Sequence, residues 1–311
     1  MKVCAGRLPG TAKIGKNNKS HMATNPLSKV RPDVTFLRPT RGLAALNLRD
    51  LWVYRELVYF LTWRDVLVRY KQTVLGATWA VIQPVIQMVV FTLIFSNAAG
   101  LSSEGVPYPI FNFTALLPWG LFSKAMNDAG RSLVTNRNMI TKIYFPRLTI
   151  PVASVLAGMV DFAIGFVVYI IIIIYYSVLP GSSYTFKFTP GLLALPACLI
   201  LAFIATLGVS LWLSAMNVIY RDVGHILPFL TQIWFFITPI VYSASVVSNR
   251  WQILYALNPL TGVVEGFRWS ILGVHSLPWQ LMAISAGVAI LLLASGLVYF
   301  RNMERTFADE I

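Results

Sequence analysis

Long apolar segments alternate with short polar stretches along most of the 311-residue chain. A helix needs about 20 mainly apolar residues to cross the hydrocarbon core of a bilayer. This length predicts six membrane-spanning helices, and therefore an all-α polytopic membrane protein. The predicted spans are Trp79–Asn97, Phe111–Met126 with some extension, Ile150–Val178, Leu192–Met216, Ile226–Tyr242 and Leu281–Phe300.

The segment 244–279, between the fifth and sixth spans, is apolar and aromatic but is broken by Pro259 and three glycines. A seventh full crossing is one alternative, but it would leave Arg301 and Arg305 outside the cell. A re-entrant pair of short helices avoids this. Non-helical backbone can exist at membrane depth only where protein or a water-filled cavity satisfies its polar groups. We therefore expect this segment to be covered by protein or to line a cavity.

Basic residues are unevenly distributed. Of the 25 Lys and Arg residues, 22 lie in four stretches: 1–76, Lys124–Arg147, Arg221 and the tail after Phe300. Juxtamembrane Lys and Arg stay on the cytoplasmic side, so the sequence predicts a bacterial inner-membrane protein with both termini in the cytoplasm. The net charge of +13 does not require nucleic acid, because anionic lipid beside the spans accounts for it.

The N-terminal region divides into two predicted parts. Residues 1–46 are polar, basic and rich in proline, which is typical of a flexible cytoplasmic tail. Residues 47–76 combine charges with an apolar stripe at helical spacing, which favours an amphipathic helix lying in the membrane interface. A helix packed on another protein surface is the alternative. The stripe consists of Trp63, Val66, Leu67, Tyr70 and Val74.

The sequence carries no pattern typical of a catalytic site. Gly10–Asn17 nearly matches a phosphate-binding P-loop, but Asn17 replaces the hydroxyl that would hold magnesium and no apolar strand precedes it. Neither an Asp-x-Asp nor a Glu-x-x-His pattern occurs, so closely spaced acids for a metal or a general base are not evident. We expect a chain that is not an enzyme, hydrolyses no ATP by itself and binds no metal or cofactor.

The sequence allows two interpretations each for Asp161 and for the aromatic residues of the spans. Asp161 is the acid well inside a predicted span, which makes it a functional candidate. Without an evident basic partner in a neighbouring span, a hydrogen bond between packed helices is the other interpretation. Aromatic residues on the first, second and fifth spans could face lipid or neighbouring helices or form interface belts. They could equally line a path for sugars, because ring faces stack on the apolar faces of pyranoses.

Several sequence blocks, in the same order along roughly residues 48–300, resemble the permease subunit of ABC-2 type exporters for lipid-linked polysaccharide. Such exporters move O-antigen, capsule or teichoic acid. The blocks are LWVYRELVYFLTWRD at Leu51–Asp65, Val68–Pro84, Leu117–Ser123, Asn138–Pro146, Asn217–Asp222, Asn258–Leu260 and Phe267–Arg268. The resemblance assigns 77–300 to the transmembrane domain and leaves 301–311 as a cytoplasmic C-terminus.

The resemblance implies a homodimer that works with two copies of a separate ATPase subunit, which binds ATP and magnesium. The interface helix 47–76 and the loop between spans two and three would contact that ATPase. The loop residues concerned are Met139, Lys142, Tyr144, Phe145 and Pro146. A substrate channel between the protomers would be lined by Trp79, Phe91, Phe95, Trp234, Phe235 and Phe236.

The implied substrate is a glycan on a polyprenyl diphosphate that enters from the inner leaflet. Arg64, Arg69 and Lys71 could attract the diphosphate through charge-assisted hydrogen bonds. Contact with anionic lipid is the alternative for these cations. Asp161, Glu265 and Arg268 are candidates for gating or packing. A small-lipid or drug exporter, and a membrane enzyme acting on a lipid-linked sugar, are the alternative functions.

Overall fold

The computed structural model describes residues 48–71, 76–98, 103–179, 184, 186, 188–244, 249–273, 279–304 and 306–307. All regular elements in these residues are helical, which confirms the all-α prediction. The predictions for the tail 1–46, for Gly10–Asn17 and for Val74 lie outside the described residues. So do 245–248 and 274–278 within the predicted re-entrant segment and most of the C-terminal stretch 305–311.

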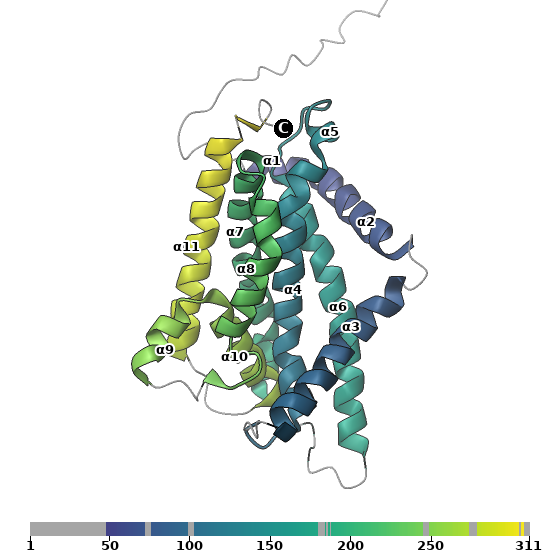
Figure 1. The fold of residues 1–311 in the computed structure, drawn as a ribbon, viewed down its shortest axis with the longest axis vertical. Coiled ribbons are helices and arrows are strands. Elements are labelled where there is room, and N and C mark those ends of the chain that lie inside the picture. Colours follow the sequence, from purple (N-terminus) through teal and green to yellow (C-terminus); the bar gives the residue numbers. More distant parts are fainter. Residues whose placement is uncertain are drawn as a thin grey trace, which may run out of the picture. The chain divides into compact units, whose positions relative to one another are not determined.

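The helices follow one another along the chain as shown in Figure 1. They are α1 (Leu48–Val53), α2 (Arg55–Lys71), α3 (Gly76–Phe91) with a π-helical continuation η2 (Thr92–Ala98), α4 (Tyr108–Thr135), α5 (Arg137–Ile140), α6 (Thr149–Val178), the 3₁₀ turn η3 (Pro190–Ala194), α7 (Leu195–Ile219), α8 (Val223–Ile237), α9 (Asn249–Ala256), α10 (Pro259–Leu272) and α11 (Trp279–Met303).

Among the residues that the structure describes, four helical segments are long and apolar enough to cross a membrane, which makes the chain a multi-pass membrane protein. They are Thr78–Ser96, Thr149–Val178, Pro190–Ile219 and Trp279–Met303. They match the first, third, fourth and sixth predicted spans. The second predicted span lies within α4, which has 28 residues but also carries charged side chains. The fifth corresponds to α8, which is apolar but only 15 residues long.

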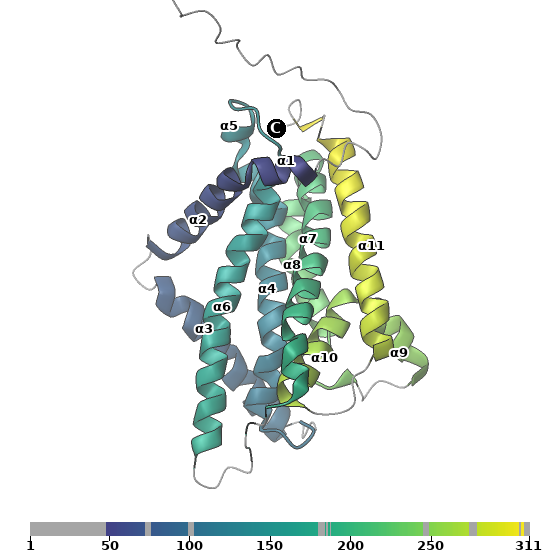
Figure 2. The same cartoon turned by 180° about the vertical axis from the view of Figure 1, so that it is seen from behind.

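Helix α4 lies at the centre of the packing and is the most thoroughly covered element (Figures 1 and 2). It packs extensively against α6, α7 and α10. Its fully buried side chains include Phe113, Phe122 and Met126. Because neighbouring helices rather than lipid surround it, α4 can carry Lys124 and Asp128 among apolar residues.

Two glycines let α7 and α11 approach closely. A Cβ atom added at Gly208 would lie 2.7 Å from the backbone nitrogen of Leu293, and one added at Gly296 would lie 2.7 Å from the carbonyl oxygen of Gly208. Small residues at a crossing allow this kind of backbone approach between helices in membranes. Residue size therefore sets the spacing of these two spans.

The two ends of the bundle differ. One end carries α1, α2, α5 and the C-terminal end of α11, whereas α9 and α10 lie at the other (Figures 1 and 2). Helix α2 packs against α6 through Val58, Leu61 and Val66. Of the predicted apolar stripe, Val66 is buried in this contact but Trp63 and Leu67 are exposed. The packed face of α2 is therefore rotated from the predicted stripe.

Candidate functional site

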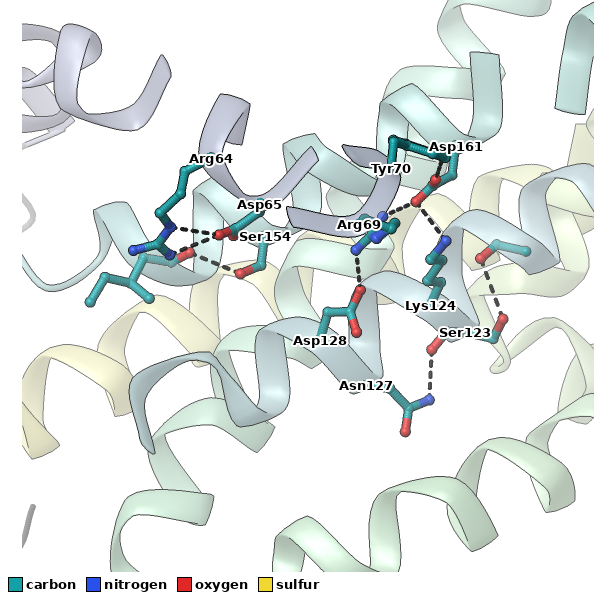
Figure 3. Close-up of polar contacts among 12 residues, drawn as sticks. Arg64, Asp65, Arg69, Tyr70, Ser123, Lys124, Asn127, Asp128, Ser154 and Asp161 are labelled. Atoms are coloured by element: carbon teal, nitrogen blue, oxygen red, sulfur yellow. Dashed lines mark hydrogen bonds and ion pairs between the residues drawn. The ribbon is translucent and has the colours of Figure 1, made fainter. Parts of the chain in front are cut away.

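Arg69, in the last turn of α2, lies between carboxylates from two other helices (Figure 3). Its Nη2 donates to Oδ2 of Asp128 on α4 at 2.5 Å, and its Nη1 donates to Oδ2 of Asp161 on α6. The Nζ of Lys124 lies 3.0 Å from the same Asp161 oxygen, and the hydroxyl of Tyr70 donates to the other one. We call these five residues the charged junction.

Local geometry explains how three helices supply these groups. Lys124 and Asp128 are four residues apart on α4, so both project from one face of that helix. Arg69 and Tyr70 are adjacent at the end of α2, where this helix approaches α6. Asp161 lies about midway along α6 and receives groups from both neighbours. The junction thus ties α2, α4 and α6 together through side chains.

The side chains of the charged junction differ in how much of their surface is exposed. The Asp161 side chain is 13% exposed and Arg69 is 22% exposed, whereas Lys124 and Asp128 are about two-fifths exposed. A carboxylate so far removed from water needs charged or hydrogen-bonding partners, and Asp161 has three. Burial, followed by the hydrogen bond to Asp161 and its negative charge, raises the pKa of Tyr70. The phenol therefore stays protonated and acts as a donor.

The expectation that Asp161 lacks a basic partner in a neighbouring span is wrong. Lys124 comes from the helix that contains the second predicted span, and Arg69 comes from α2, 92 residues away in sequence. Sequence reasoning also missed Lys124, Asp128 and Tyr70 as members of the site. The spacing of Lys124 and Asp128 at the inner end of a predicted span was the available signal.

A cleft of about 560 Å³ opens beside the junction, between α2, α4 and α6. Two of the three cations predicted to attract a diphosphate, Arg64 and Arg69, line it, and Arg131 adds a third guanidinium. Arg64 is paired with Asp65 at 2.7 Å. Lys71 is exposed in the last turn of α2 and is not among the lining residues. The lining residues are Arg64, Asp65, Val68, Arg69, Asp128, Arg131, Ser132, Thr135, Asn136 and Ser154.

Four of the six aromatic residues predicted to line a channel form one cluster. Phe91 stacks on Phe235 with ring centroids 5.4 Å apart and contacts Phe95 at 5.9 Å. The cluster also includes Trp234, 5.0 Å from the ring of Phe122 on α4. Trp119 joins it 5.4 Å from Phe235.

The other two predicted channel residues are placed differently. Trp79 on α3 and Phe236 on α8 are both exposed, and the ring of Phe236 packs edge-on against that of Phe235. The cluster is a partly buried contact among α3, η2, α4 and α8. Its rings therefore also stabilise the packing of α3 and α8 on α4, in keeping with the alternative that these aromatic residues face neighbouring helices.

The predicted ATPase-coupling residues lie in and after α5 and point in different directions. Tyr144 is 77% exposed and Lys142 is also exposed. Phe145 is only 6% exposed and packs in a core cluster with residues of α2, α4, α6, α7 and α11. Met139 packs against the same cluster and Pro146 is half-buried. The segment thus combines an outward-facing tyrosine with an inward-facing phenylalanine.

Glu265 and Arg268 lie in α10, which is at the end of the bundle opposite to α1 and α5 (Figure 1). The guanidinium of Arg268 donates to Glu265 at 3.0 Å and to the carbonyl oxygens of Ile240 and Tyr242 at 2.8 and 3.0 Å. It also lies 3.9 Å above the ring of Phe111 on α4. These contacts fix the irregular backbone that follows α8. We call Glu265, Arg268 and their backbone partners the buried clamp.

Comparison with known proteins gives consistent matches. Residues 56–272 match the ABC-2 type transporter family. The chain is 28% identical over 269 residues to the O-antigen export system permease protein RfbA of Myxococcus xanthus, covering 85% of this chain and 98% of the relative.

A Klebsiella pneumoniae protein of the same name is 26% identical over 254 residues, with 82% and 94% of the two chains covered. The polysialic acid transport protein KpsM of Escherichia coli is 22% identical over 242 residues, with 78% and 91% covered. The family match extends over more than two thirds of the sequence and includes the junction, the aromatic cluster and the buried clamp. The chain belongs to the ABC-2 type transporter family.

Proposed function

We propose that this chain is the membrane-spanning permease subunit of an ATP-driven exporter that moves a lipid-linked, O-antigen-like polysaccharide from the cytoplasm across the bacterial inner membrane. The observation that carries the proposal is the similarity to a permease of an O-antigen export system over 98% of that relative's length. Family membership alone supports transport, whereas similarity over nearly the whole relative also supports the class of cargo.

The proposed assembly is a homodimer with two copies of a separate ATPase subunit, which binds ATP and magnesium. In this arrangement α4 and α8 complete six spans, α9 and α10 form a re-entrant pair, and both termini are cytoplasmic. The charge pattern supports this orientation, because 22 of the 25 Lys and Arg residues then lie on the cytoplasmic side. It puts α2, α5 and the charged junction at the cytoplasmic end.

The cleft beside the junction is the proposed entrance for the diphosphate of the lipid carrier. Arg64, Arg69 and Arg131 supply guanidinium groups, which bind phosphate oxygens through paired hydrogen bonds. Lys71 extends this positive region at the end of α2. Contact between Arg69 and the more exposed Asp128 can be exchanged for contact with phosphate, while Asp161 keeps α2 attached to α6.

The proposed path for the glycan runs along the aromatic residues of α3 and α8. Phe236 and Trp79 are exposed and can stack on sugar rings, and the cluster around Phe91 and Phe235 supports the wall behind them. Stacking tolerates different sugars because it uses the apolar face of a ring. Such a wall suits a long polymer whose units pass one after another.

The proposed contact with the ATPase is centred on Tyr144. This residue and Ile143 have exposed side chains in the segment just after α5, and α5 lies at the same end of the bundle as α1 (Figure 1). An aromatic side chain that fills a pocket at an interface typically contributes a large share of the binding energy. Met139, Phe145 and Pro146 then serve to hold the segment in place.

The proposal is tested by deleting the gene in the native host and complementing it with the wild-type chain. We expect the deletion strain to lose its surface polysaccharide and to accumulate the polyprenyl-linked glycan in the cytoplasmic leaflet, and complementation to reverse both effects. A small-lipid or drug exporter would instead change sensitivity to small amphiphiles and leave the surface glycan intact. A membrane enzyme would change the structure of the glycan rather than its location.

A further inference from the structure

We propose that the end of the chain after α11, through Glu304 and Phe307, positions the ATPase-coupling segment and connects it to the last spanning helix. The inference rests on the proposed function and adds a role for residues outside the region matched to the family. We call the contacts of Glu304 and Phe307 with Arg147 the C-terminal brace.

The first part of the brace consists of polar contacts to Arg147, three residues after the exposed Tyr144. The backbone N–H of Arg147 donates to Oε1 of Glu304 at 3.3 Å. The guanidinium of Arg147 donates to the backbone carbonyl oxygen of Glu304. Glu304 also accepts a hydrogen bond from Arg301 in the last turn of α11. Glu304 therefore holds the coupling segment on one side and α11 on the other.

The second part of the brace is apolar. Phe307 is fully buried and packs edge-on against Phe300 of α11, with ring centroids 5.3 Å apart. The guanidinium of Arg147 lies over the ring of Phe307, 5.9 Å from its centre. Phe145, Phe300 and Phe307 all belong to one core cluster. Removing the Phe307 ring would leave a cavity between the coupling segment and α11.

The brace determines which helices move when the ATPase pushes on Tyr144. The chain itself carries that force into α6, which begins at Thr149. The brace adds a second route, because Phe145 and Arg147 are attached to the end of α11. A push on the coupling segment then moves α6 and α11 together. Without the brace, the segment would keep the packing of Phe145 in the core cluster but lose its attachment to α11 through Arg147, and hydrolysis would be less well coupled to transport.

The test uses the full-length permease with its ATPase in lipid nanodiscs and proteoliposomes. Phe307→Ala should leave the amount of bound ATPase unchanged and lower glycan export per ATP hydrolysed by roughly fivefold or more. Phe307→Leu, which keeps an apolar side chain in the cluster, is the matched control and should stay near wild type. Tyr144→Ala should show the opposite pattern, with reduced ATPase binding.

A second readout does not depend on transport. Spin labels on cysteines replacing the exposed Thr141 and Asn302 report the distance between the coupling segment and α11. We expect Phe307→Ala to broaden this distance distribution and Tyr144→Ala to leave it unchanged. Wild-type coupling together with an unchanged distribution in Phe307→Ala would overturn the brace. Absence of glycan export by the wild-type chain, with the distribution still broadened by Phe307→Ala, would instead contradict the proposed function and leave the brace standing.

Discussion

Arg69 and Arg268 both pair with carboxylates, but they do so in different surroundings. The Arg268 side chain is 3% exposed and binds Glu265 on its own helix together with two backbone carbonyl oxygens. The Arg69 side chain is 22% exposed, lines a cleft and binds the carboxylates of Asp128 and Asp161, which lie on two other helices.

The two arginines therefore have different structural roles: the buried clamp holds one stretch of backbone in place, whereas the charged junction connects three helices. The buried clamp satisfies backbone groups that have no helical partner after α8, so it cannot exchange partners without disturbing the fold. The charged junction joins α2, α4 and α6 by side chains near a cleft, so one partner can be exchanged while the helices stay folded. Arginine–carboxylate pairs therefore give rigidity in the buried clamp and allow rearrangement in the charged junction.

The largest effect should come from breaking the buried clamp. Arg268→Met removes the guanidinium that donates to Glu265 and to two backbone carbonyl oxygens, and we expect a loss of about 3–5 kcal/mol in the free energy of unfolding. Denaturant unfolding in mixed micelles measures this loss. Arg221→Met, at an exposed arginine, is the control and should change stability by no more than about 0.5 kcal/mol. Equal stability of the two variants would contradict a structural role for the buried clamp.

A smaller effect should follow when the most buried acid of the charged junction is neutralised. Asp161→Asn weakens the acceptor for Arg69, Lys124 and Tyr70, and we expect a loss of about 1–3 kcal/mol in the same measurement. Asp128→Asn is the matched control. It should cost less, because Arg69 keeps its bond to Asp161. The reverse order of the two variants would show that Asp128 anchors α2.

The junction should also act as a coupled unit. In a double-mutant cycle of Arg69→Met and Asp161→Asn, we expect a coupling free energy of about 0.5–3 kcal/mol, because the two groups are in direct contact. The pair Arg268→Met and Asp161→Asn, whose side chains contact different residues, serves as the comparison. Its two effects should add within about 0.5 kcal/mol.

The smallest expected effect is a difference in salt sensitivity. Raising ionic strength screens partly exposed charges more than buried ones, since the Debye length falls from roughly 10 Å at 0.1 M to about 3 Å at 1 M salt. The loss caused by Asp128→Asn should therefore shrink in high salt, whereas the loss caused by Arg268→Met should stay constant. Thermal unfolding of both variants across a salt series measures this. Parallel salt responses would mean that the two regions are equally shielded from solvent.

Much of the helical layout could be predicted because apolar length is a strong local signal. The predicted span Ile150–Val178 differs from α6 by one residue at its start, and Leu281–Phe300 lies within α11. The extent of α4 could not be predicted in the same way. It continues to Thr135 past Lys124 because neighbouring helices cover it, and that cover is a property of the tertiary structure.

The candidate site was predicted less completely than the fold. Arg64, Arg69 and Asp161 could be selected as charges next to or inside apolar segments, but the pairing of Arg69 with Asp161 joins positions 92 residues apart. Similarly, Tyr144 and Phe145 are adjacent aromatic residues in a short loop, where no periodic pattern indicates which one faces inward. Phe145 is buried because the ends of α2, α7 and α11 meet there.

The most direct test of the account is ATP-driven translocation by the purified permease–ATPase complex. In proteoliposomes with the ATPase facing outward, a polyprenyl-diphosphate-linked glycan supplied in the outer leaflet is exposed to an added glycosidase. The account predicts that ATP drives the glycan into the vesicles and so makes it resistant to the glycosidase. A non-hydrolysable ATP analogue should leave it susceptible. Full susceptibility of the glycan in the presence of ATP, with ATP-dependent uptake of a small amphiphile by the same vesicles, would contradict it.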